Sequence, residues 1–265
     1  SFARTIKLHT SHQVFATDID PKTMQEAALF EAYDAVLDEE RLGQCDITLV
    51  ALFPAAIVEW ITAHAPSFRP GSLVIDCGGG KQVICDALRP VTQAASWHFI
   101  GGHPMAGRER WGFRYAQDTL FDRASMILTP DPWIDPAVLA RARDFFLSLG
   151  FPRVQFSTPR EHDEMIAYTS QLAHVVSSAY VKSPAARNHR GFSAGSFADL
   201  TRVARLNENM WTELFFDNRE ALLPELEALT QRITEYRDAL RSGDRETMQR
   251  LLREGREIKE ALTEP

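Results

Sequence analysis

The sequence has few cysteines and none of the spacings in which cysteines pair or bind metal. Its 265 residues include three cysteines, Cys45, Cys77 and Cys85, and no Cys-x-x-Cys pair. An odd count without such spacing argues against a disulfide framework and against a structural zinc site. We therefore expect no metal ion and a reducing, cytoplasmic setting.

Long apolar runs and clusters of positive charge are also missing. No apolar run reaches the roughly 18 residues that a membrane span needs, and the opening residues, SFARTIKLHT, lack the apolar core of a signal peptide. The formal net charge is -7 and the basic residues are dispersed, so there is no electrostatic footprint for nucleic acid or an anionic membrane. These absences favour a soluble protein whose partner is a small-molecule substrate.

Short apolar runs alternate with helix-like segments over the first part of the chain. The helix-like segments include residues 57–64 and 136–149, and the apolar runs read QVFAT, DITLVALF, GSLVIDC, HFIGG, ASMILTP and RVQFST. Strand and helix alternating at this rhythm predict an α/β domain with a parallel sheet. After Pro159 the strand signals stop, so we predict an α/β domain over residues 1–157 and an all-helical domain over residues 158–265.

The helical part carries apolar stripes that a chain of this size cannot cover by itself. The stripes advance by three and four residues, first through Met165, Thr169, Leu172, Val176 and Ala179, and later through Leu222, Leu226, Leu229, Ile233, Tyr236 and Leu240. Helices of this kind bury their stripes against another surface, which predicts a homodimer through the helical domain.

An acidic residue stands where a dinucleotide-binding unit reads the ribose of its cofactor. In VFATDIDP, residues 14–21, Asp18 follows a short apolar run. An acid there accepts hydrogen bonds from the ribose hydroxyls of NAD and repels a 2′-phosphate. The alternative is that Asp18 and Asp20 form a turn or cap the helix predicted from PKTMQEAA.

The glycine-rich turn G-x-G-x-x-G that precedes such an acid is absent from the sequence. Ser1 falls in what resembles the first crossover helix, with Phe2, Ile6 and His9 spaced to pack on the sheet. We expect the natural protein to carry roughly a dozen further residues, an apolar strand running into the glycine turn.

Two glycine-containing segments supply further candidate site residues. In VIDCGGGKQ, Gly78 and Gly79 let a cofactor or substrate approach the end of a strand, or they form a plain turn. In IGGHPMAG, His103 lies on a predicted glycine-flanked loop stiffened by Pro104, beside the expected cofactor position. A neutral imidazole there accepts a proton from a substrate hydroxyl while hydride leaves the same carbon. Alternatively, His103 is a surface residue or a satisfied hydrogen-bonding group.

Five motifs in a fixed order carry a family resemblance. They are GGHPMAG, LFDRASMILTP, HDEMIAYTSQLAH, FADLTRVA and MWTELFFDN, and they span most of the chain. Together they resemble the prephenate dehydrogenases of tyrosine biosynthesis. The resemblance implies a Rossmann-type doubly wound parallel sheet, a helical dimerisation domain, and oxidative decarboxylation of prephenate to 4-hydroxyphenylpyruvate with NAD.

The resemblance also implies roles for individual residues. His103 matches the catalytic histidine, Arg202 the arginine that binds a substrate carboxylate, and His174 a second histidine that contacts substrate. Ser170 lies one helical turn before His174. The other positions that the resemblance places around the site are Glu109, Asp199 and Trp211.

Two departures from the family pattern bear on the site. Gly79 stands where many relatives have a serine, so any help that this hydroxyl gives in orienting the histidine or the substrate must come from elsewhere. Arg108 stands where relatives often have a threonine. Its charge favours a dianionic substrate, or its side chain points to solvent.

Two other functions stay open. The first is arogenate dehydrogenase, which carries out the same reaction on a substrate with an amino group in place of the side-chain keto group. Only Arg108 favours prephenate over arogenate as the substrate. A non-catalytic Rossmann-type dimer that senses a ligand is the second, and the intact His103 and Arg202 argue against it.

Overall fold

The computed structural model describes residues 1–107 and 112–262. By their internal contacts, its residues form two compact units, Ser1–Asn218 and Arg219–Pro265. The first unit holds the sheets and the helices up to residue 218, so the change from strands to helices near residue 157 lies inside it. The domain division at residues 157 and 158 stays a prediction.

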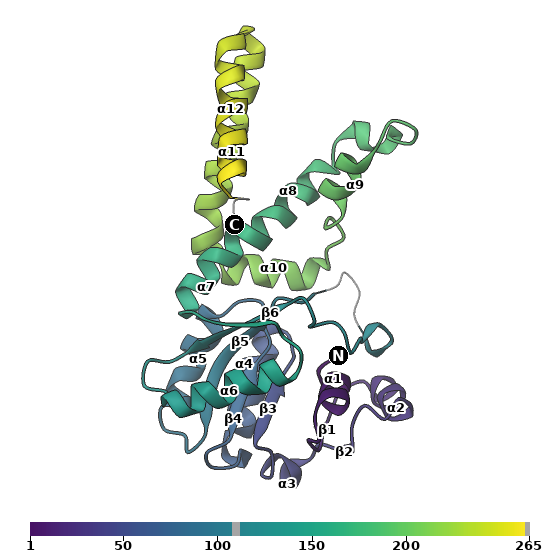
Figure 1. The fold of residues 1–265 in the computed structure, drawn as a ribbon, viewed down its shortest axis with the longest axis vertical. Helices are drawn as coiled ribbons and strands as arrows, with labels where there is room; N and C mark the ends of the chain where they lie inside the picture. The colour runs from purple at the N-terminus through teal and green to yellow at the C-terminus, as the bar shows by residue number, and fades with distance from the viewer. Residues whose placement is uncertain (108–111, 263–265) are drawn as a thin grey trace. The chain divides into compact units, whose positions relative to one another are not determined.

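Five strands form the central sheet of the first unit, in the order β3-β4-β5-β6-β7 (Figure 1). Neighbouring strands are parallel, as predicted, except for β5 and β6, which are antiparallel. A parallel return needs a crossover, usually a helix, whereas the described chain between β5 and β6 contains only the short 3-10 helix η2 (Phe113–Tyr115). The strands are β3 (Ile47–Val50), β4 (Leu73–Asp76), β5 (His98–Pro104), β6 (Ser125–Pro130) and β7 (Arg153–Phe156).

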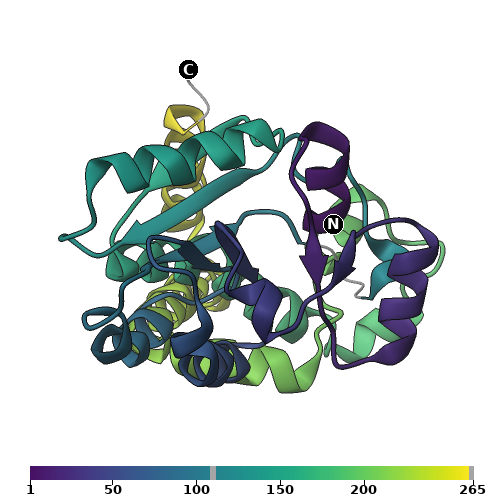
Figure 2. The same cartoon turned by 90° about the horizontal axis from the view of Figure 1, so that it is seen from below.

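Helices cover both faces of this sheet (Figure 2). Helices α4 (Pro54–His64) and α5 (Gln82–Thr92) lie on one face, and α6 (Pro136–Ser148) lies on the other. The side chains of β4 alternate between the two layers, because Val74 packs with the α4 and α5 cluster while Leu73 and Ile75 pack with the α6 cluster. The predicted helices at residues 57–64 and 136–149 and the Rossmann-type fold class are confirmed.

The first residues form a smaller layer beside this sheet. Helix α1 (Phe2–His9) packs Phe2 and Ile6 against the α6 cluster, as predicted, whereas His9 is exposed. Strands β1 and β2 pair with each other in a separate parallel sheet, which no described strand joins to β3. The described strands therefore form two separate sheets. This layer also includes β1 (Phe15–Ala16), α2 (Pro21–Leu29), β2 (Ala35–Val36) and α3 (Glu39–Leu42), with η1 (Ala65–Ser67) following α4.

After β7 the described chain is helical, as predicted. The first of these helices begins at a capping box, in which Thr158 and Glu161 bond to each other's backbone N–H groups. In the first unit the segments are α7 (Pro159–Ile166), the π-helical turn η3 (Ala167–Leu172), α8 (Ala173–Tyr180), η4 (Pro184–Asn188), α9 (Gly195–Thr201) and α10 (Glu208–Asp217).

The first predicted apolar stripe does not face the interior of the single chain, and its burial against a second copy stays a prediction. Met165 is 60% exposed, Thr169 and Ala179 are also exposed, and only Leu172 of the five stripe residues is buried. The buried residues advance by four residues and then by five across η3, because a π-turn adds one residue to the helical turn. They are His162, Asp163, Ile166, Ala167, Gln171 and Leu172.

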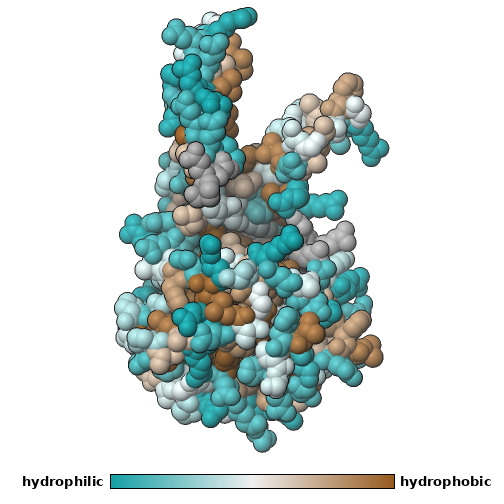
Figure 3. Space-filling model, viewed as in Figure 1, coloured by the Kyte–Doolittle hydropathy of each residue, from teal (hydrophilic) through white to brown (hydrophobic). Residues whose placement is uncertain are grey.

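The second unit is a hairpin of two helices, α11 (Arg219–Ser242) and α12 (Arg245–Ala261). Gly243 adopts a φ of 72° at the turn, and Asp244 caps α12. Figure 3 shows apolar residues gathered along one side of this hairpin. Its exposed apolar residues are Leu223, Ile233, Leu240, Leu252, Ile258 and Leu262. Among helices within residues 1–107 and 112–262, none has both the length and the apolar character that crossing a membrane requires.

The segment IGGHPMAG is not the loop that the sequence predicted. Residues up to Pro104 belong to β5 and pair with β6, which places His103 opposite Ile127. A Cβ atom on Gly101 would collide with Thr129 Oγ1, and one on Gly102 would lie 2.5 Å from the backbone oxygen of Asp76. The two glycines are therefore required by packing inside the sheet, rather than by a ligand.

We expect Gly102→Ala to lower the free energy of unfolding by about 1–3 kcal/mol, because the added methyl group meets backbone that cannot move aside. Chemical denaturation followed by circular dichroism measures the change. Gly80→Ala is the matched control, since a Cβ at Gly80 has open space around it. Equal unfolding midpoints for the two variants would contradict this account of β5.

Candidate active site

A cleft opens at the carboxyl ends of β1, β3 and β4. It is lined by Asp18 after β1, by residues 51–54 after β3, and by residues 77–79 after β4. Its volume is about 1760 Å³, whereas ordinary small-molecule pockets have roughly 300–1,000 Å³. Open α/β sheets bind ligands at this edge, so the cleft has the position and the size for a dinucleotide.

The structure brings three of the four predicted cofactor residues to this cleft. Asp18, Gly78 and Gly79 line it, and Pro104 does not. Asp18 also accepts a hydrogen bond from Asp20 N at 2.9 Å, and Asp20 caps α2 through Lys22 N and Thr23 N. The turn-and-cap interpretation of this pair is therefore confirmed, with Asp20 as the cap and Asp18 in the turn, and both residues line the cleft.

The glycines after β4 differ in what surrounds them. A Cβ on Gly78 would lie 3.0 Å from Ile57 Cδ1 and from Ile84 Cδ1, inside the packed layer under α4 and α5. A Cβ on Gly79 would meet only Leu214, at 3.3 Å. Gly78 is thus restricted by the core, while Gly79 borders the cleft with room for a small side chain.

A completely buried ion pair lies under this turn. Lys81 and Asp76 have no exposed side-chain surface and pair with each other, and Lys81 Nζ also donates to Gly102 O at 2.7 Å. Asp76 accepts from Gly78 N at 2.9 Å and from Gly102 N at 3.1 Å. One carboxylate therefore fixes the end of β4, the glycine turn and the residue before His103.

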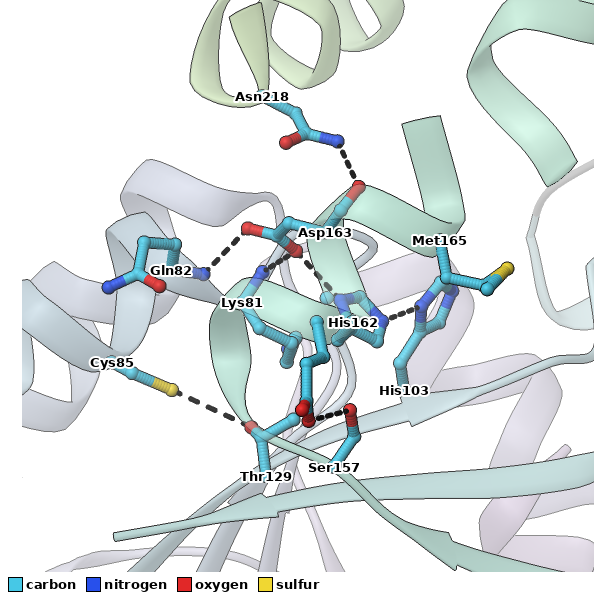
Figure 4. Close-up of polar contacts among 12 residues, drawn as sticks. Lys81, Gln82, Cys85, His103, Thr129, Ser157, His162, Asp163, Met165 and Asn218 are labelled. Carbon is cyan, nitrogen blue, oxygen red and sulfur yellow. Dashed lines mark hydrogen bonds and ion pairs between the residues drawn. The ribbon is translucent and has the colours of Figure 1, made fainter. Parts of the chain in front are cut away.

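His103 lies near the carboxyl end of β5, where its ring points toward α7 (Figure 4). Its Nδ1 atom is 2.8 Å from Nε2 of His162. Burial lowers the pKa of His103 well below the ordinary value of 6.5, and the neighbouring His162 and Lys81 lower it further. The ring is therefore neutral at physiological pH and able to accept a proton.

The contact continues from His162 to Asp163. His162 Nδ1 lies 2.7 Å from Asp163 Oδ1, and both residues are almost completely buried. The carboxylate of Asp163 also accepts from the backbone N–H groups of Lys81 and Gln82, each at 2.8 Å, at the start of α5. Asn218 donates to the backbone oxygen of Asp163 at 2.8 Å.

The predicted substrate residues of the helical segments form a second group. His174 Nδ1 is 2.8 Å from Ser170 O, one turn earlier, and the His174 ring stacks on Trp211 with centroids 4.0 Å apart. Ser170, His174 and Trp211 are thus brought together. Arg202 is exposed at the end of α9, and Asp199 is exposed within it. Arg108 and Glu109 lie outside the described residues.

Sequence reasoning missed the buried polar residues around His103. The available signal for Asp76 and Lys81 was a carboxylate that ends an apolar strand, five residues before a lysine. His162 and Asp163 begin the motif HDEMIAYTSQLAH. The predicted apolar stripe starts instead at Met165, which is exposed. Asn218 and Gln171 had no signal, because their roles depend on tertiary contacts.

Two family models match the chain. Residues 2–153 match the nucleotide-binding domain of prephenate dehydrogenase, and residues 158–254 match the prephenate dehydrogenase dimerization domain.

Curated relatives carry related names. Prephenate dehydrogenase of Bacillus subtilis (strain 168) is 27% identical over 195 residues, which cover 72% of this chain and 52% of that protein. Prephenate dehydrogenase of Lactococcus lactis subsp. cremoris is 27% identical over 225 residues, 83% of this chain and 61% of that protein. Cyclohexadienyl dehydrogenase of Zymomonas mobilis is 28% identical over 238 residues, 86% of this chain and 80% of that protein. The chain therefore spans about half the length of the Bacillus relative.

Solved structures share the fold. Arogenate dehydrogenase of Synechocystis superimposes with a TM-score of 0.82 at 24% identity, over 99% of this chain and 95% of that one. Prephenate dehydrogenase from A. aeolicus, in complex with hydroxyphenyl propionate and NAD+, gives a TM-score of 0.84 at 22% identity, over 98% and 93%. With both of its parts matched in sequence order, this chain belongs to the prephenate dehydrogenase family.

Proposed function

We propose that this protein converts prephenate to 4-hydroxyphenylpyruvate by oxidative decarboxylation with NAD, in tyrosine biosynthesis. The observation that carries the proposal is the neutral ring of His103 near the carboxyl end of β5. Asp76 joins that strand to the cleft, because it accepts hydrogen bonds both from Gly102 N and from Gly78 N. A proton acceptor is thereby held beside a cleft that fits a dinucleotide.

The chemistry requires a base at the ring hydroxyl of the substrate. NAD, when bound, supplies the acceptor for the hydride that leaves the hydroxyl-bearing carbon. His103 accepts the hydroxyl proton as that carbon is oxidised, which its lowered pKa permits at neutral pH. The bond to the ring carboxylate then breaks, carbon dioxide leaves, and its electron pair completes the aromatic ring. The proton returns from His103 to the phenol oxygen.

The residues of the cleft support NAD as the cofactor. We assign the ribose hydroxyls to Asp18, whose side chain lies on the cleft wall, and the approach of the cofactor to Gly79. Asp18 also disfavours the 2′-phosphate of NADP by charge repulsion. The complex with NAD+ of the A. aeolicus relative supports this choice.

We assign the substrate side chain to the cluster of Ser170, His174 and Trp211, and a substrate carboxylate to Arg202. The stacked rings of His174 and Trp211 offer a flat apolar surface with a polar edge. Two copies of the chain dimerise through the helical part in this proposal, as the description of the matching family domain indicates. We place the enzyme in the cytoplasm.

Arogenate is the alternative substrate. The structural similarity to Synechocystis arogenate dehydrogenase favours it. The two substrates differ only in a keto or amino group on the side chain. A comparison of kcat/KM for prephenate and arogenate separates them, and a higher value for arogenate would overturn the assignment to prephenate.

The wild-type protein should form NADH from prephenate, and His103→Asn should lower kcat by about 100-fold or more with a modest change in KM, as the loss of a general base does. Absorbance of NADH measures both constants. His98→Asn, at the other end of β5, is the control and should retain activity. Near wild-type turnover in His103→Asn would remove His103 from this role.

Arg202→Ala should raise KM for prephenate at least about tenfold with a smaller effect on kcat, because a charge-assisted contact is lost from both the ground state and the transition state. Arg205→Ala, on a neighbouring exposed arginine, controls for the loss of one positive charge. If the two variants have the same KM, the carboxylate is bound elsewhere.

Asp18→Ser should narrow the preference for NAD over NADP, because it removes the charge that repels the 2′-phosphate. The ratio of kcat/KM for the two cofactors measures the preference. Asp38→Ser is the matched variant, since Asp38 caps α3 and is not among the residues that line the cleft, and it should leave the ratio unchanged. Equal use of both cofactors by the wild-type protein would contradict the role of Asp18.

A further inference from the structure

The carboxylate of Asp163 determines where the protons of the neighbouring rings lie. Three nitrogen atoms surround it, namely Lys81 N, Gln82 N and His162 Nδ1, at 2.8, 2.8 and 2.7 Å. An ionised carboxylate only accepts hydrogen bonds, so His162 carries a proton on Nδ1. The start of α5 supplies the other two donors, where a negative charge is also favoured by the helix dipole.

The proton on Nδ1 of His162 sets the tautomer of His103. In a neutral ring protonated at Nδ1, the other nitrogen, Nε2, is an acceptor. This Nε2 lies 2.8 Å from Nδ1 of His103, which must therefore donate. The other nitrogen of His103, Nε2, then carries no proton, and this is the form that accepts a proton.

The competing arrangement is a protonated His162. Both of its nitrogens would then donate, His103 would carry its proton on Nε2, and the ring could not act as a base. That arrangement places a positive charge on a ring that is only 2% exposed and lies 2.8 Å from the ring of His103. A neutral His162 avoids the cost of burying that charge.

Neighbouring elements fix the position of this pair. Asn218 Nδ2 donates to Asp163 O and to Gln171 Oε1, each at 2.8 Å, and Gln171 Nε2 donates to Leu214 O at 2.9 Å. Asp163 is thereby held between α10 on one side and the start of α5 on the other. The ring of His162 has little freedom to rotate away from His103.

From these contacts we propose that His162 and Asp163 are positioning residues that hold His103 in the tautomer with an unprotonated Nε2. The proposal rests on the proposed function of His103 as the proton acceptor. His162 and Asp163 act through His103, as an orienting carboxylate acts through a catalytic histidine in other enzymes.

The tautomers are measured directly by 15N NMR of the full chain labelled at histidine, without substrate, with His103→Asn and His162→Gln used to assign the signals. At neutral pH we expect a proton on Nδ1 and none on Nε2 in both rings. A proton on Nε2 of His103, or a doubly protonated His162, would overturn the proposal. This measurement does not depend on activity, so it separates a failure of the proposal from a failure of the proposed function.

Kinetics distinguish positioning from support of the fold. His162→Leu removes the acceptor for His103 Nδ1 and should lower kcat roughly 10–100-fold with little change in KM. His162→Gln can place a carbonyl oxygen near the original Nε2. Its kcat should therefore lie much closer to the wild-type value than that of His162→Leu. His98→Leu is the matched control and should resemble the wild type, with thermal unfolding recorded for all three. The positioning role would be refuted if His162→Leu and His162→Gln lost kcat equally. A wild-type kcat in a folded His162→Leu variant would refute it as well.

The pH profile adds a readout that a structural role would not move. The titratable groups facing His103 are His162 and Asp163 from α7, Lys81 before α5, and Asp76 from β4. In the wild type the acid limb of kcat/KM should lie below pH 6.5, because burial, His162 and Lys81 all lower the pKa of His103. In His162→Leu the limb should move, since the variant removes both the ring that influences the pKa of His103 and the acceptor for its Nδ1 proton. An unmoved limb would count against the proposal. If His162→Leu fails to fold, the tautomers of the wild type still decide it.

Discussion

The carboxylate of Asp163 is the interaction on which the geometry of the site depends. It accepts from two backbone N–H groups at the start of α5 and from the ring of His162, while its own backbone oxygen accepts from Asn218. Hydrogen bonds to an ionised acceptor are roughly twice as strong as neutral ones. Asp163 therefore joins α5, α7 and the end of α10 at one point, and through His162 it contacts the ring of His103 on β5.

A second carboxylate lies beside the glycines that precede His103, where it accepts from Gly102 N. Asp76 and Lys81 form a buried pair, and the lysine stem runs past β5 to reach Gly102 O. Removing one partner of such a pair costs about 3–5 kcal/mol, because the other charge stays buried. A side chain on Gly101 would meet this stem and Thr129. The pattern GGH therefore reflects close packing inside the sheet, by Thr129, Cys85 and the Lys81 stem at Gly101 and by the backbone of Asp76 at Gly102, although in the sequence it resembles a loop built for a ligand.

More of the fold than of the site could be predicted from the sequence. Alternating strand and helix signals gave the sheet, the helices α4 and α6, and the change to helices after β7, because each depends on local patterns of apolar residues. The antiparallel pairing of β6 and the strand conformation of His103 depend on partners far along the chain and had no local signal. His103, Ser170, His174 and Trp211 were identified by resemblance, whereas Lys81, His162 and Asp163 were not, since their burial is a property of the packed structure.

The π-turn η3 brings residues from both of its ends into one buried polar network. A regular helix starting at α7 would keep its buried face at steps of three and four residues. The extra residue in η3 instead allows His162 and Asp163 at the start, and Gln171 and Leu172 at the end, to face the interior together. Gln171 then reaches Asn218, which in turn holds Asp163. Met165 and Tyr168 are left on the outside, 60% and 59% exposed. The extra residue of the π-turn therefore places Gln171 in the network beside His103, and the apolar side chains of Met165 and Tyr168 remain on the outside of the helix.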